Sequence, residues 1–426
     1  MALKLTLVAT LTAGASALVA APAARPAAPA LRAATLDASA APAAKDLTGS
    51  IPDCPATLWD ADDVDVAAAR LVQEPLPEAC PVERVAPSAD AGAAYFREHA
   101  DDILADLKAH GCVWLRGFDL MKTEAGFRKF YEAVGLDPCL DPIHTSGLRS
   151  FASQEDAIYE EVNKESLSQH YIGLHQESTH KKTATYGAFV CFQPATESGG
   201  EFMIADAAKI ARELDVDVAQ RMYDKKIRIS VSNLDMDFLG ALGPGKDGAM
   251  EGVRQLVDKA VAPKFDMDLE MIYGSDGKPM RLQAVERVAS PFNRHPETGE
   301  LLWFCNVHNH ARYLRDRRPC NVPEVGMTEV YHGDLSPIAP ADLDHINEVS
   351  ERNIARIPMQ PGDVLLCDNY RVLHGRDIFR GDRYHAVAWF GGLVKDRPAD
   401  FDDENANSKP GDFLNKMVNK FLVDSF

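Results

Sequence analysis

Short β-prone segments separated by irregular loops constrain the fold of this chain most. They are TYGAFVCF, IRISVSN, LEMIY, MRLQAVERV, LLWFCNV, DVLLCD and YHAVAWF. Many short strands joined by such loops are typical of β-sandwiches and barrels. The sequence therefore predicts a mainly β fold with helices, of the α+β class, in which the helices are insertions or decorations.

Three stretches with helical periodicity accompany the strands. The first lies between Tyr95 and Gly111, where the helix should stop and a short strand follow. The second carries an apolar stripe from Phe127 to Val134. The third begins at about Asp206. Its apolar face carries Ile210, Leu214, Val218 and Met222.

The composition indicates the domain organisation and the classes of partner that the chain favours. A chain of 426 residues with 46% hydrophobic and 26% charged residues favours one large catalytic domain with appendages. Its 64 acidic and 45 basic residues give a net charge of -19. Nucleic acid is an unfavourable partner, because nonspecific binding depends on Lys and Arg neutralising phosphates. A small cationic substrate would suit the electrostatic field of the chain.

The N-terminal 50 residues are typical of a targeting segment. Lys4, Arg25 and Arg32 are present and no acid appears before Asp37, while the apolar stretch at 5–21 is too short for a membrane span. The small residues of ASALVAAP mark a cleavage site, and the following Ala- and Pro-rich stretch is typical of a transit peptide. The segment resembles the bipartite plastid leaders of algae with complex plastids. Secretion and a disordered tail are the alternatives, and no stable membrane span is expected in the mature protein.

The cysteines indicate a reducing compartment. Eight are scattered along the chain, without a C-x-x-C pair, and most lie in apolar runs such as AFVCF and VLLCD. Buried free thiols are therefore expected rather than a disulfide framework. Only Cys54 and Cys80, in a polar N-terminal stretch, are placed to pair.

The motif H-x-E at His175 and Glu177 carries the first chemical signal. In an extended segment, residues two apart project to the same side, so this imidazole and carboxylate can reach one metal ion. His374, which lies 199 residues later after a buried-strand pattern, is a candidate third ligand. Two histidines and one carboxylate that leave one face of an octahedron open form the facial triad of non-haem Fe(II) oxygenases. A surface His beside a surface Glu is the plain alternative.

Arginines at 376, 380 and 383 follow His374 within nine residues. A 2-oxo acid that chelates iron through one end leaves its distal carboxylate to be bound, and a guanidinium meets a carboxylate with two parallel hydrogen bonds. Arg383, at the head of the segment RYHAVAWF, could reach back towards the metal. A solvated or structural ion pair explains Arg380 better, and Arg376 is left open.

The order of H-x-E, QPATESGGE, HPETGELLWF, YHGDLSPI and DNYRVLHGRDIFRGDR resembles the taurine dioxygenase and clavaminate synthase-like superfamily of Fe(II)/2-oxoglutarate oxygenases. The sequence is most similar to the branch of the syringomycin-pathway aspartyl hydroxylase, and its distal pattern resembles γ-butyrobetaine hydroxylases. This resemblance, over about residues 110–393, implies a double-stranded β-helix, or jelly roll. It implies that His175, Glu177 and His374 bind Fe(II), and that Arg383 binds the cosubstrate 2-oxoglutarate.

The same resemblance implies O2 and a small amino-acid-like or betaine-like substrate as partners. An unactivated C–H bond would be hydroxylated, with release of succinate and CO2. Halogenases of this type lack the carboxylate, so Glu177 favours hydroxylation or desaturation. Such relatives are often homo-oligomers.

One departure from the family pattern concerns the cosubstrate. Relatives read G-G-E-T or G-G-D-T and use the Thr hydroxyl at 2-oxoglutarate, whereas Phe202 follows the glycines here. Another hydroxyl, such as that of Thr185 or Tyr186, could complete the site. Asn306 either faces the pocket or is a structural residue at a strand end. A catalytically impaired 2-oxoglutarate-binding protein of the same fold is therefore an alternative.

A zinc hydrolase is the other alternative. It would use His175, Glu177 and His180 with His308 or His310, but HQESTH lacks the H-E-x-x-H order that places two histidines one helical turn apart. The two later histidines either face substrate or are exposed loop residues.

The expected organisation has four parts. They are a leader at 1–50, an N-terminal extension at 51–90, the oxygenase domain at 91–395 with a lid insertion at about 233–300, and a tail at 396–426. Four acids of the lid could receive an ammonium group, although a solvated acidic face is the plainer explanation. They are Asp235, Asp237, Asp266 and Asp268.

Overall fold

The computed structural model describes most of the chain from residue 80 to residue 397. The described residues are 80–139, 151–153, 158–160, 163, 167–178, 183–235, 252, 255, 267–273, 279–320 and 328–397. The expected leader, His180, the expected C-terminal tail beyond residue 397 and the side chains of the four lid acids lie outside this description.

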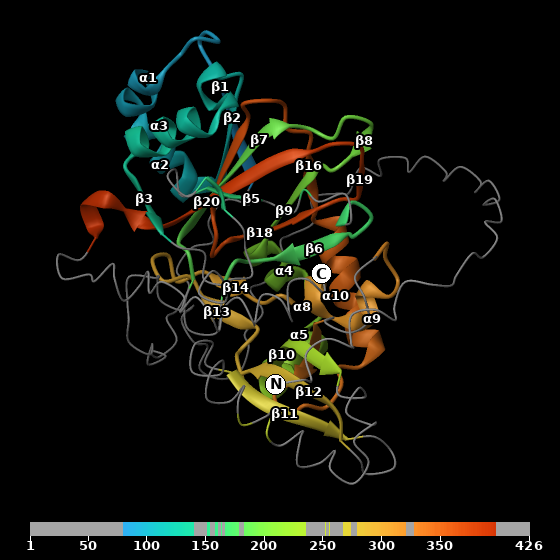
Figure 1. Ribbon diagram of the computed structural model, residues 1–426. Helices are drawn as coiled ribbons and strands as arrows, with labels where there is room; N and C mark the ends of the chain where they lie inside the picture. The colour runs from blue at the N-terminus through green and yellow to red at the C-terminus, as the bar shows by residue number, and fades with distance from the viewer. Residues whose placement is uncertain are drawn as a thin grey trace, which may run out of the picture. The chain divides into compact units, whose positions relative to one another are not determined.

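Two β-sheets form the centre of the fold (Figure 1). The large sheet has the order β1-β2-β17-β7-β20-β5-β4, and β3 also pairs with β20. Its strands are β1 (Cys80–Val85), β2 (Gly111–Arg116), β3 (Leu136–Cys139), β4 (Phe151–Ser153), β5 (Ile158–Glu160), β7 (Tyr186–Gln193), β17 (Val364–Asp368) and β20 (Tyr384–Leu393). The small sheet has the order β16-β9-β18-β6. Its strands are β6 (Ile172–His175), β9 (Phe202–Asp206), β16 (Ala355–Ile357) and β18 (Val372–Arg376).

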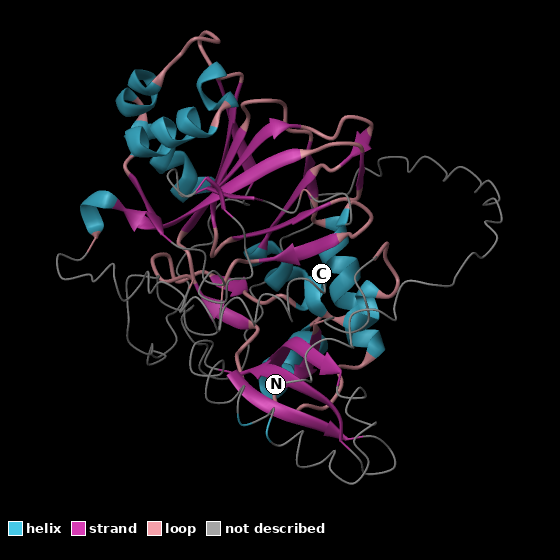
Figure 2. Cartoon of the chain, in the orientation of Figure 1, coloured by secondary structure: helices cyan, strands magenta, loops and turns pink. Residues whose placement is uncertain are grey.

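A buried cluster between the two sheets shows that they face each other. Phe189, Val387 and Trp389 of the large sheet pack with Phe202 and Ile204 of the small sheet. The alternate residues of β20, such as Ala386 and Ala388, belong to a different cluster on the outer face. Both faces of this strand are therefore buried, which explains its continuous apolar sequence. The predicted jelly-roll core with helices is confirmed (Figure 2).

Three helices cover the outer face of the large sheet. They are α1 (Ala93–Glu98), α2 (Ala100–His110) and α3 (Glu124–Val134), with the 3-10 turn η1 (Asp119–Lys122). The first predicted helix is in fact two, because His99 leaves helical backbone angles (φ -106°, ψ 14°) and its ring stacks on Tyr95. α2 ends at His110, and the next residue, Gly111, adopts a left-handed φ of 71°. Glycine reaches this conformation without the steric cost that other residues incur.

Helices and short strands cover the outer face of the small sheet around a second large core. The helices are α4 (Ala207–Glu213), α5 (Val216–Lys225), α8 (Val307–His310), α9 (Arg312–Arg315) and α10 (Pro340–Arg352). The third predicted helix is also two, because the Asp215 carboxylate accepts the N–H groups of Asp217 and Val218 and starts a new helix. In the predicted strand LLWFCNV, only Leu301–Trp303 is extended, and Val307 already begins α8.

The remaining strands form smaller sheets. They are β10 (Ile227–Asp235), β11 (Met267–Tyr273), β12 (Pro279–Glu286) and β15 (Glu329–His332), then the pair β13 (Phe292–Arg294) and β14 (Leu301–Trp303), and the pair β8 (Ser198–Gly199) and β19 (Phe379–Arg380). The six cysteines with described side chains are free, as expected, and the pairing of Cys54 with Cys80 lies outside the described side chains. None of the described helices is long and apolar enough to cross a membrane.

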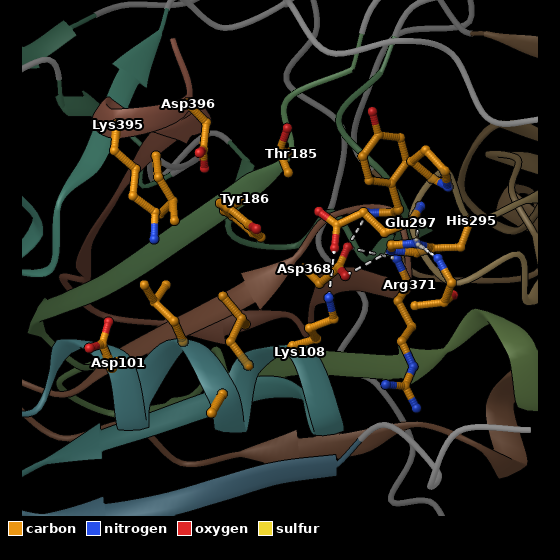
Figure 3. A pocket seen from close by; sticks show the side chains of 17 residues that line it. Asp101, Lys108, Thr185, Tyr186, His295, Glu297, Asp368, Arg371, Lys395 and Asp396 are labelled. Atoms are coloured by element: carbon orange, nitrogen blue, oxygen red, sulfur yellow. Dashed lines mark hydrogen bonds and ion pairs between the residues drawn. The ribbon is translucent and has the colours of Figure 1, made fainter.

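A cavity of about 450 Å³ lies where β7 begins and β17 and β20 end, beside α2 (Figure 3). His295 contacts Asp368 at 3.0 Å across its wall, and Lys108 contacts Glu297 at 3.4 Å. The residues that follow Asp368 form another part of the wall. Asn369, in the same segment, accepts a hydrogen bond from the backbone of Glu177, which belongs to the candidate active site.

Candidate active site

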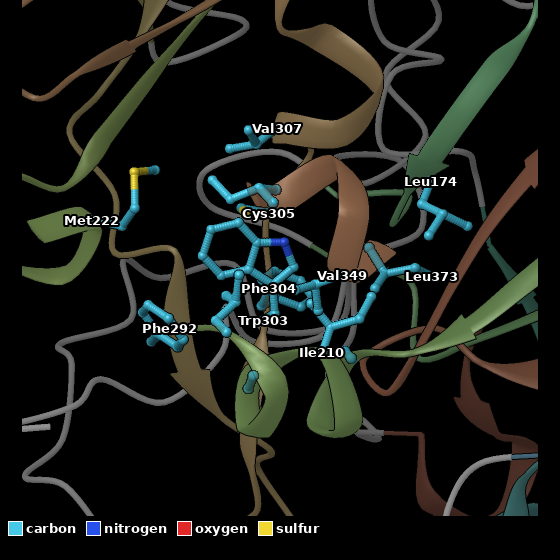
Figure 4. Close-up of a cluster of buried hydrophobic side chains, with 14 of the residues drawn as sticks. Leu174, Ile210, Met222, Phe292, Trp303, Phe304, Cys305, Val307, Val349 and Leu373 are labelled. Carbon is cyan, nitrogen blue, oxygen red and sulfur yellow. The ribbon is translucent and has the colours of Figure 1, made fainter. Parts of the chain in front are cut away.

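Strands β6 and β18 bring two distant histidines together. The strands are antiparallel, with His175 opposite His374, and their ring centroids lie 4.4 Å apart. The preceding residues, Leu174 and Leu373, are buried in the core on the outer face of the small sheet (Figure 4). Because successive side chains of a strand point to opposite faces, both histidines point into the space between the sheets.

Glu177 completes a cluster with a metal-binding donor set. One ligand atom from each of His175, Glu177 and His374 lies within 4.8 Å of the others. Bonds of about 2 Å to a single cation would span this spacing after small side-chain rotations. His175 Nδ1 donates a hydrogen bond to the Gly173 carbonyl at 2.9 Å, which leaves Nε2 as the ligand atom. Two imidazoles and one carboxylate in a largely buried position fit Fe(II).

A buried asparagine holds the carboxylate ligand in place. β6 ends at His175, so the backbone of Glu177 has left the sheet. The Asn369 amide restores both lost contacts: its Oδ1 accepts the Glu177 N–H at 3.1 Å, and its Nδ2 donates to the Glu177 carbonyl at 3.0 Å. The same Nδ2 donates to the Ala184 carbonyl at 2.9 Å, and Asn369 is only 1% exposed. The position of Glu177 therefore depends on a residue 192 positions away in the chain.

Side chains at the start of α8 bind the free edge of β6. Asn306 accepts the Gln176 N–H at 3.0 Å and donates to its carbonyl at 3.2 Å. The Leu174 N–H donates to His308 Nδ1 at 2.8 Å, and the Gly173 N–H donates to Asn309 Oδ1 at 3.0 Å. Asn306 thus has the structural role that was one of its two predicted alternatives. These contacts replace the neighbouring strand that an edge strand lacks.

The prediction that His308 and His310 are exposed loop residues is wrong: His310 lies in α8 and is partly buried, and His308 is fully buried in the same helix. Its ring is 1% exposed, and both nitrogens are engaged, because Nε2 contacts Arg318 and Glu351. Burial lowers the pKa of His308 to about 4, so the ring is neutral and able to accept at Nδ1. His310 Nδ1 lies 2.8 Å from the Thr328 hydroxyl. Neither residue belongs to the metal-binding cluster found among the described residues.

The three arginines after His374 have different environments. Arg376 is fully buried and donates to the carbonyls of Leu167, His170 and Asp377, so it has a structural role. Arg380 is exposed, as expected. Arg383 is 4% exposed, and its Nη1 donates to Asn163 Oδ1 at 3.1 Å.

Gly200 opens the space that Arg383 occupies. A Cβ atom at this position would lie 3.2 Å from Arg383 Cδ and 3.3 Å from Nε, and the φ of 77° is itself unfavourable for other residues. Gly200 therefore leaves room for the arginine side chain. The sequence offered no signal for Asn163, because its contacts with Arg383 cross 220 positions.

Phe202 forms an apolar wall beside the histidines. Its ring is parallel to that of His374, at 4° and a centroid distance of 6.2 Å, and lies 4.4 Å from the Phe189 ring. The hydroxyl of Thr185 donates to the Gly391 carbonyl at 2.6 Å and so is already engaged. Thr185 and Tyr186 both line the separate cavity beside α2. These observations do not support the predicted role of Thr185 or Tyr186 at the cosubstrate.

The chain is similar to known proteins over most of its length. The model of the family described as "Taurine catabolism dioxygenase TauD, TfdA family" matches residues 74–389. The dapdiamide synthesis protein DdaC of Enterobacter agglomerans is 24% identical over 301 residues, which cover 69% of this chain and 85% of DdaC.

Two solved structures are also similar. PvcB of Pseudomonas aeruginosa has a TM-score of 0.44 and 14% identity, over 78% of this chain and 91% of PvcB. An asparagine oxygenase in complex with Fe(II), 2S,3S-3-hydroxyasparagine and succinate has a TM-score of 0.41 and 13% identity, over 71% of this chain and 80% of that protein.

Proposed function

Because the chain belongs to the taurine catabolism dioxygenase TauD/TfdA family, whose members are non-haem Fe(II)- and 2-oxoglutarate-dependent oxygenases, we propose that it hydroxylates a small amino-acid-like or betaine-like molecule. The reaction would insert oxygen into an unactivated C–H bond and convert 2-oxoglutarate to succinate and CO2. The observation that carries the proposal is the convergence of His175, Glu177 and His374 from distant parts of the chain.

In this proposal each residue has a separate task. His175, Glu177 and His374 would hold Fe(II), and a set of three protein ligands would leave positions for cosubstrate and oxygen. The bound metal supplies the activation of oxygen. The hydrogen bond from His175 Nδ1 to Gly173 fixes the ring orientation, and Asn369 fixes Glu177. Phe189 and Phe202 provide an apolar wall that excludes water from the histidines.

We propose that Arg383 binds the distal carboxylate of 2-oxoglutarate. Its guanidinium is buried, and a buried cation favours an anionic partner. The preference for an amino-acid-like or betaine-like substrate is supported by the net charge of -19, which favours cations. It is also supported by the similarity to a protein of dapdiamide synthesis, which favours a small molecule over a macromolecule.

The test combines spectroscopy and turnover. Anaerobic addition of Fe(II) and 2-oxoglutarate should produce the charge-transfer band of a 2-oxo acid chelate, and His374→Ala should abolish it. In air, the wild type should consume oxygen and release succinate with the correct member of a panel of free amino acids and quaternary amines. Failure of the wild type to bind iron, or full coupled turnover by His374→Ala, would overturn the proposal.

A catalytically impaired binding protein is the second candidate, because Phe202 supplies no hydroxyl to the cosubstrate. The same experiment separates the two functions. An impaired protein would form the chelate band but would not release succinate with any substrate of the panel.

We also propose that residues 1–50 are a plastid-targeting leader, with secretion as the alternative. The acid-free, Ala- and Pro-rich composition up to Asp37 supports this proposal. Fusion of these residues to a fluorescent protein in an alga with complex plastids should direct the fusion into the plastid. Secretion of the fusion would contradict it.

A further inference from the structure

His385 is a buried histidine that the proposed function leaves without a task. Its side chain is 2% exposed, and Nδ1 has no hydrogen-bond partner among the described residues. Its backbone is fixed, because Asn163 Oδ1 accepts the His385 N–H at 3.0 Å and Asn163 Nδ2 donates to its carbonyl at 2.7 Å. Buried polar atoms in proteins ordinarily have a partner, so an unpaired one suggests a ligand that belongs there.

The position of His385 on β20 places it between Arg383 and the metal ligands. Val387 and Trp389 lie in the core between the two sheets, and residues two apart in a strand share a face. Trp389 is at the metal end of this row, with its ring 5.8 Å from that of His374. Cys191, which pairs with His385 across the strands, belongs to the same core. A molecule that extends from the metal-binding cluster to Arg383 would therefore pass His385.

The electrostatic environment of His385 favours an anion. Burial, followed by the charges of Arg383 and Arg376, holds the pKa of His385 well below 6.5. The ring is therefore neutral at physiological pH and carries one N–H group. The same two guanidinium groups that oppose a charge on this ring attract a carboxylate.

A carboxylate beside Arg383 can also accept hydrogen bonds from a second residue. Each of its two oxygens can accept about two hydrogen bonds, and a guanidinium in bidentate contact supplies only about two of them in all. Phe202 and Phe189 pack against each other on the walls between the sheets, and their side chains have no donor. We propose that His385, in the tautomer protonated at Nδ1, donates a hydrogen bond to the distal carboxylate of 2-oxoglutarate next to Arg383. The inference rests on the proposed function, because it assumes that this cosubstrate binds between His374 and Arg383.

The experiment measures binding rather than turnover. The full chain is loaded with Mn(II), which does not react with oxygen in this site, and is titrated with two ligands by calorimetry. One ligand is 2-oxoglutarate, and the other is 2-oxopentanoate, which has the same chain length and the same chelating end but a methyl group in place of the distal carboxylate. Replacement of a residue that contacts the distal carboxylate should weaken the binding of 2-oxoglutarate and leave the binding of 2-oxopentanoate unchanged.

Three variants are compared with the wild type. His385→Leu should weaken 2-oxoglutarate binding about tenfold or more, because a hydrogen bond to a charged group is lost, and should leave 2-oxopentanoate binding unchanged. His385→Gln keeps an N–H donor and should retain most of the affinity. His332→Leu is the matched control, because His332 on β15 is also 2% exposed with an unpaired Nδ1 and lies outside the core between the sheets. It should change neither affinity.

A measurement on the wild type covers the case in which His385→Leu does not fold. In the Zn(II)-loaded chain labelled with 15N-histidine, the Nδ1 signal that disappears in His385→Gln should shift with 2-oxoglutarate and not with 2-oxopentanoate. An unchanged signal, or an equal loss of both ligands in a folded His385→Leu, overturns the inference about His385 alone. If the wild type does not bind 2-oxoglutarate at all, the proposed cosubstrate site fails as well.

Discussion

Replacement of Asn369 by alanine should weaken metal binding although Asn369 is not a metal ligand. The substitution removes three hydrogen bonds, of 2.9 to 3.1 Å, that Asn369 makes in a buried position with the Glu177 N–H and with the carbonyls of Glu177 and Ala184. At about 1 kcal/mol for each bond, we expect the free energy of unfolding to fall by about 3 kcal/mol. The loss of support for Glu177 should weaken metal affinity by about tenfold to a hundredfold.

Two assays separate these effects. Urea-induced unfolding of the metal-free protein measures stability, and calorimetric titration with Mn(II) measures affinity. Asn293→Ala is the matched control, because Asn293 is also buried and its amide donates to the carbonyls of Ser290 and Phe304. It should lower stability without a comparable change in metal affinity. The reasoning is refuted if folded Asn369→Ala binds Mn(II) as the wild type does, or if Asn293→Ala weakens metal binding equally.

Three further predictions follow from the same contacts. Arg383→Ala should weaken 2-oxoglutarate binding about a hundredfold, whereas Arg380→Ala, at an exposed position, should leave the affinity within error in the same titration. Gly375→Ala should lower the thermal unfolding midpoint and metal affinity, because its Cβ would lie 2.6 Å from the Ile172 carbonyl oxygen and push β6 away; an unchanged midpoint would contradict this. Burial lowers the pKa of His308 to about 4, so the unfolded chain binds more protons between pH 6.5 and 4. The free energy of unfolding should fall as pH decreases through this window, and this slope should be smaller in His308→Gln.

The sequence was sufficient to predict the fold class, because the patterns that indicate strands and helices are local. Strands such as β17 and β20 are buried on both faces and appear as continuous apolar runs. Helix boundaries were less accurate, since periodicity alone does not detect a break. His99 and Asp215 each interrupt an apolar stripe that continues in phase on the other side. The Asp215 cap was readable in principle, because Asp is a preferred N-cap residue.

Only those residues of the site whose side chains have recognisable chemistry could be predicted from the sequence. The motif spacing drew attention to His175, Glu177 and His374, and the structure brings these three together. The motif spacing favoured Arg383 for the cosubstrate but left the role of Arg376 open, because the structural role of Arg376 depends on tertiary contacts. His308 shows the same limit: a histidine near an apolar strand can be a ligand, an exposed residue or a buried acceptor, and only the fold decides.

The supporting residues of the site have a common physical origin. A metal-binding carboxylate two residues after a strand requires the chain to leave the sheet, and each backbone group that leaves must find another partner if it remains buried. Asn369 and Asn306 meet this need at Glu177 and Gln176, since a single amide both donates and accepts as a strand would. Both asparagines follow closely after a strand, in LLCDN and LLWFCN. An asparagine shortly after a strand is therefore a candidate for holding the backbone of a nearby loop that carries a metal ligand. In this chain, the position of the metal-binding carboxylate depends on these amides as well as on the strand that carries His175.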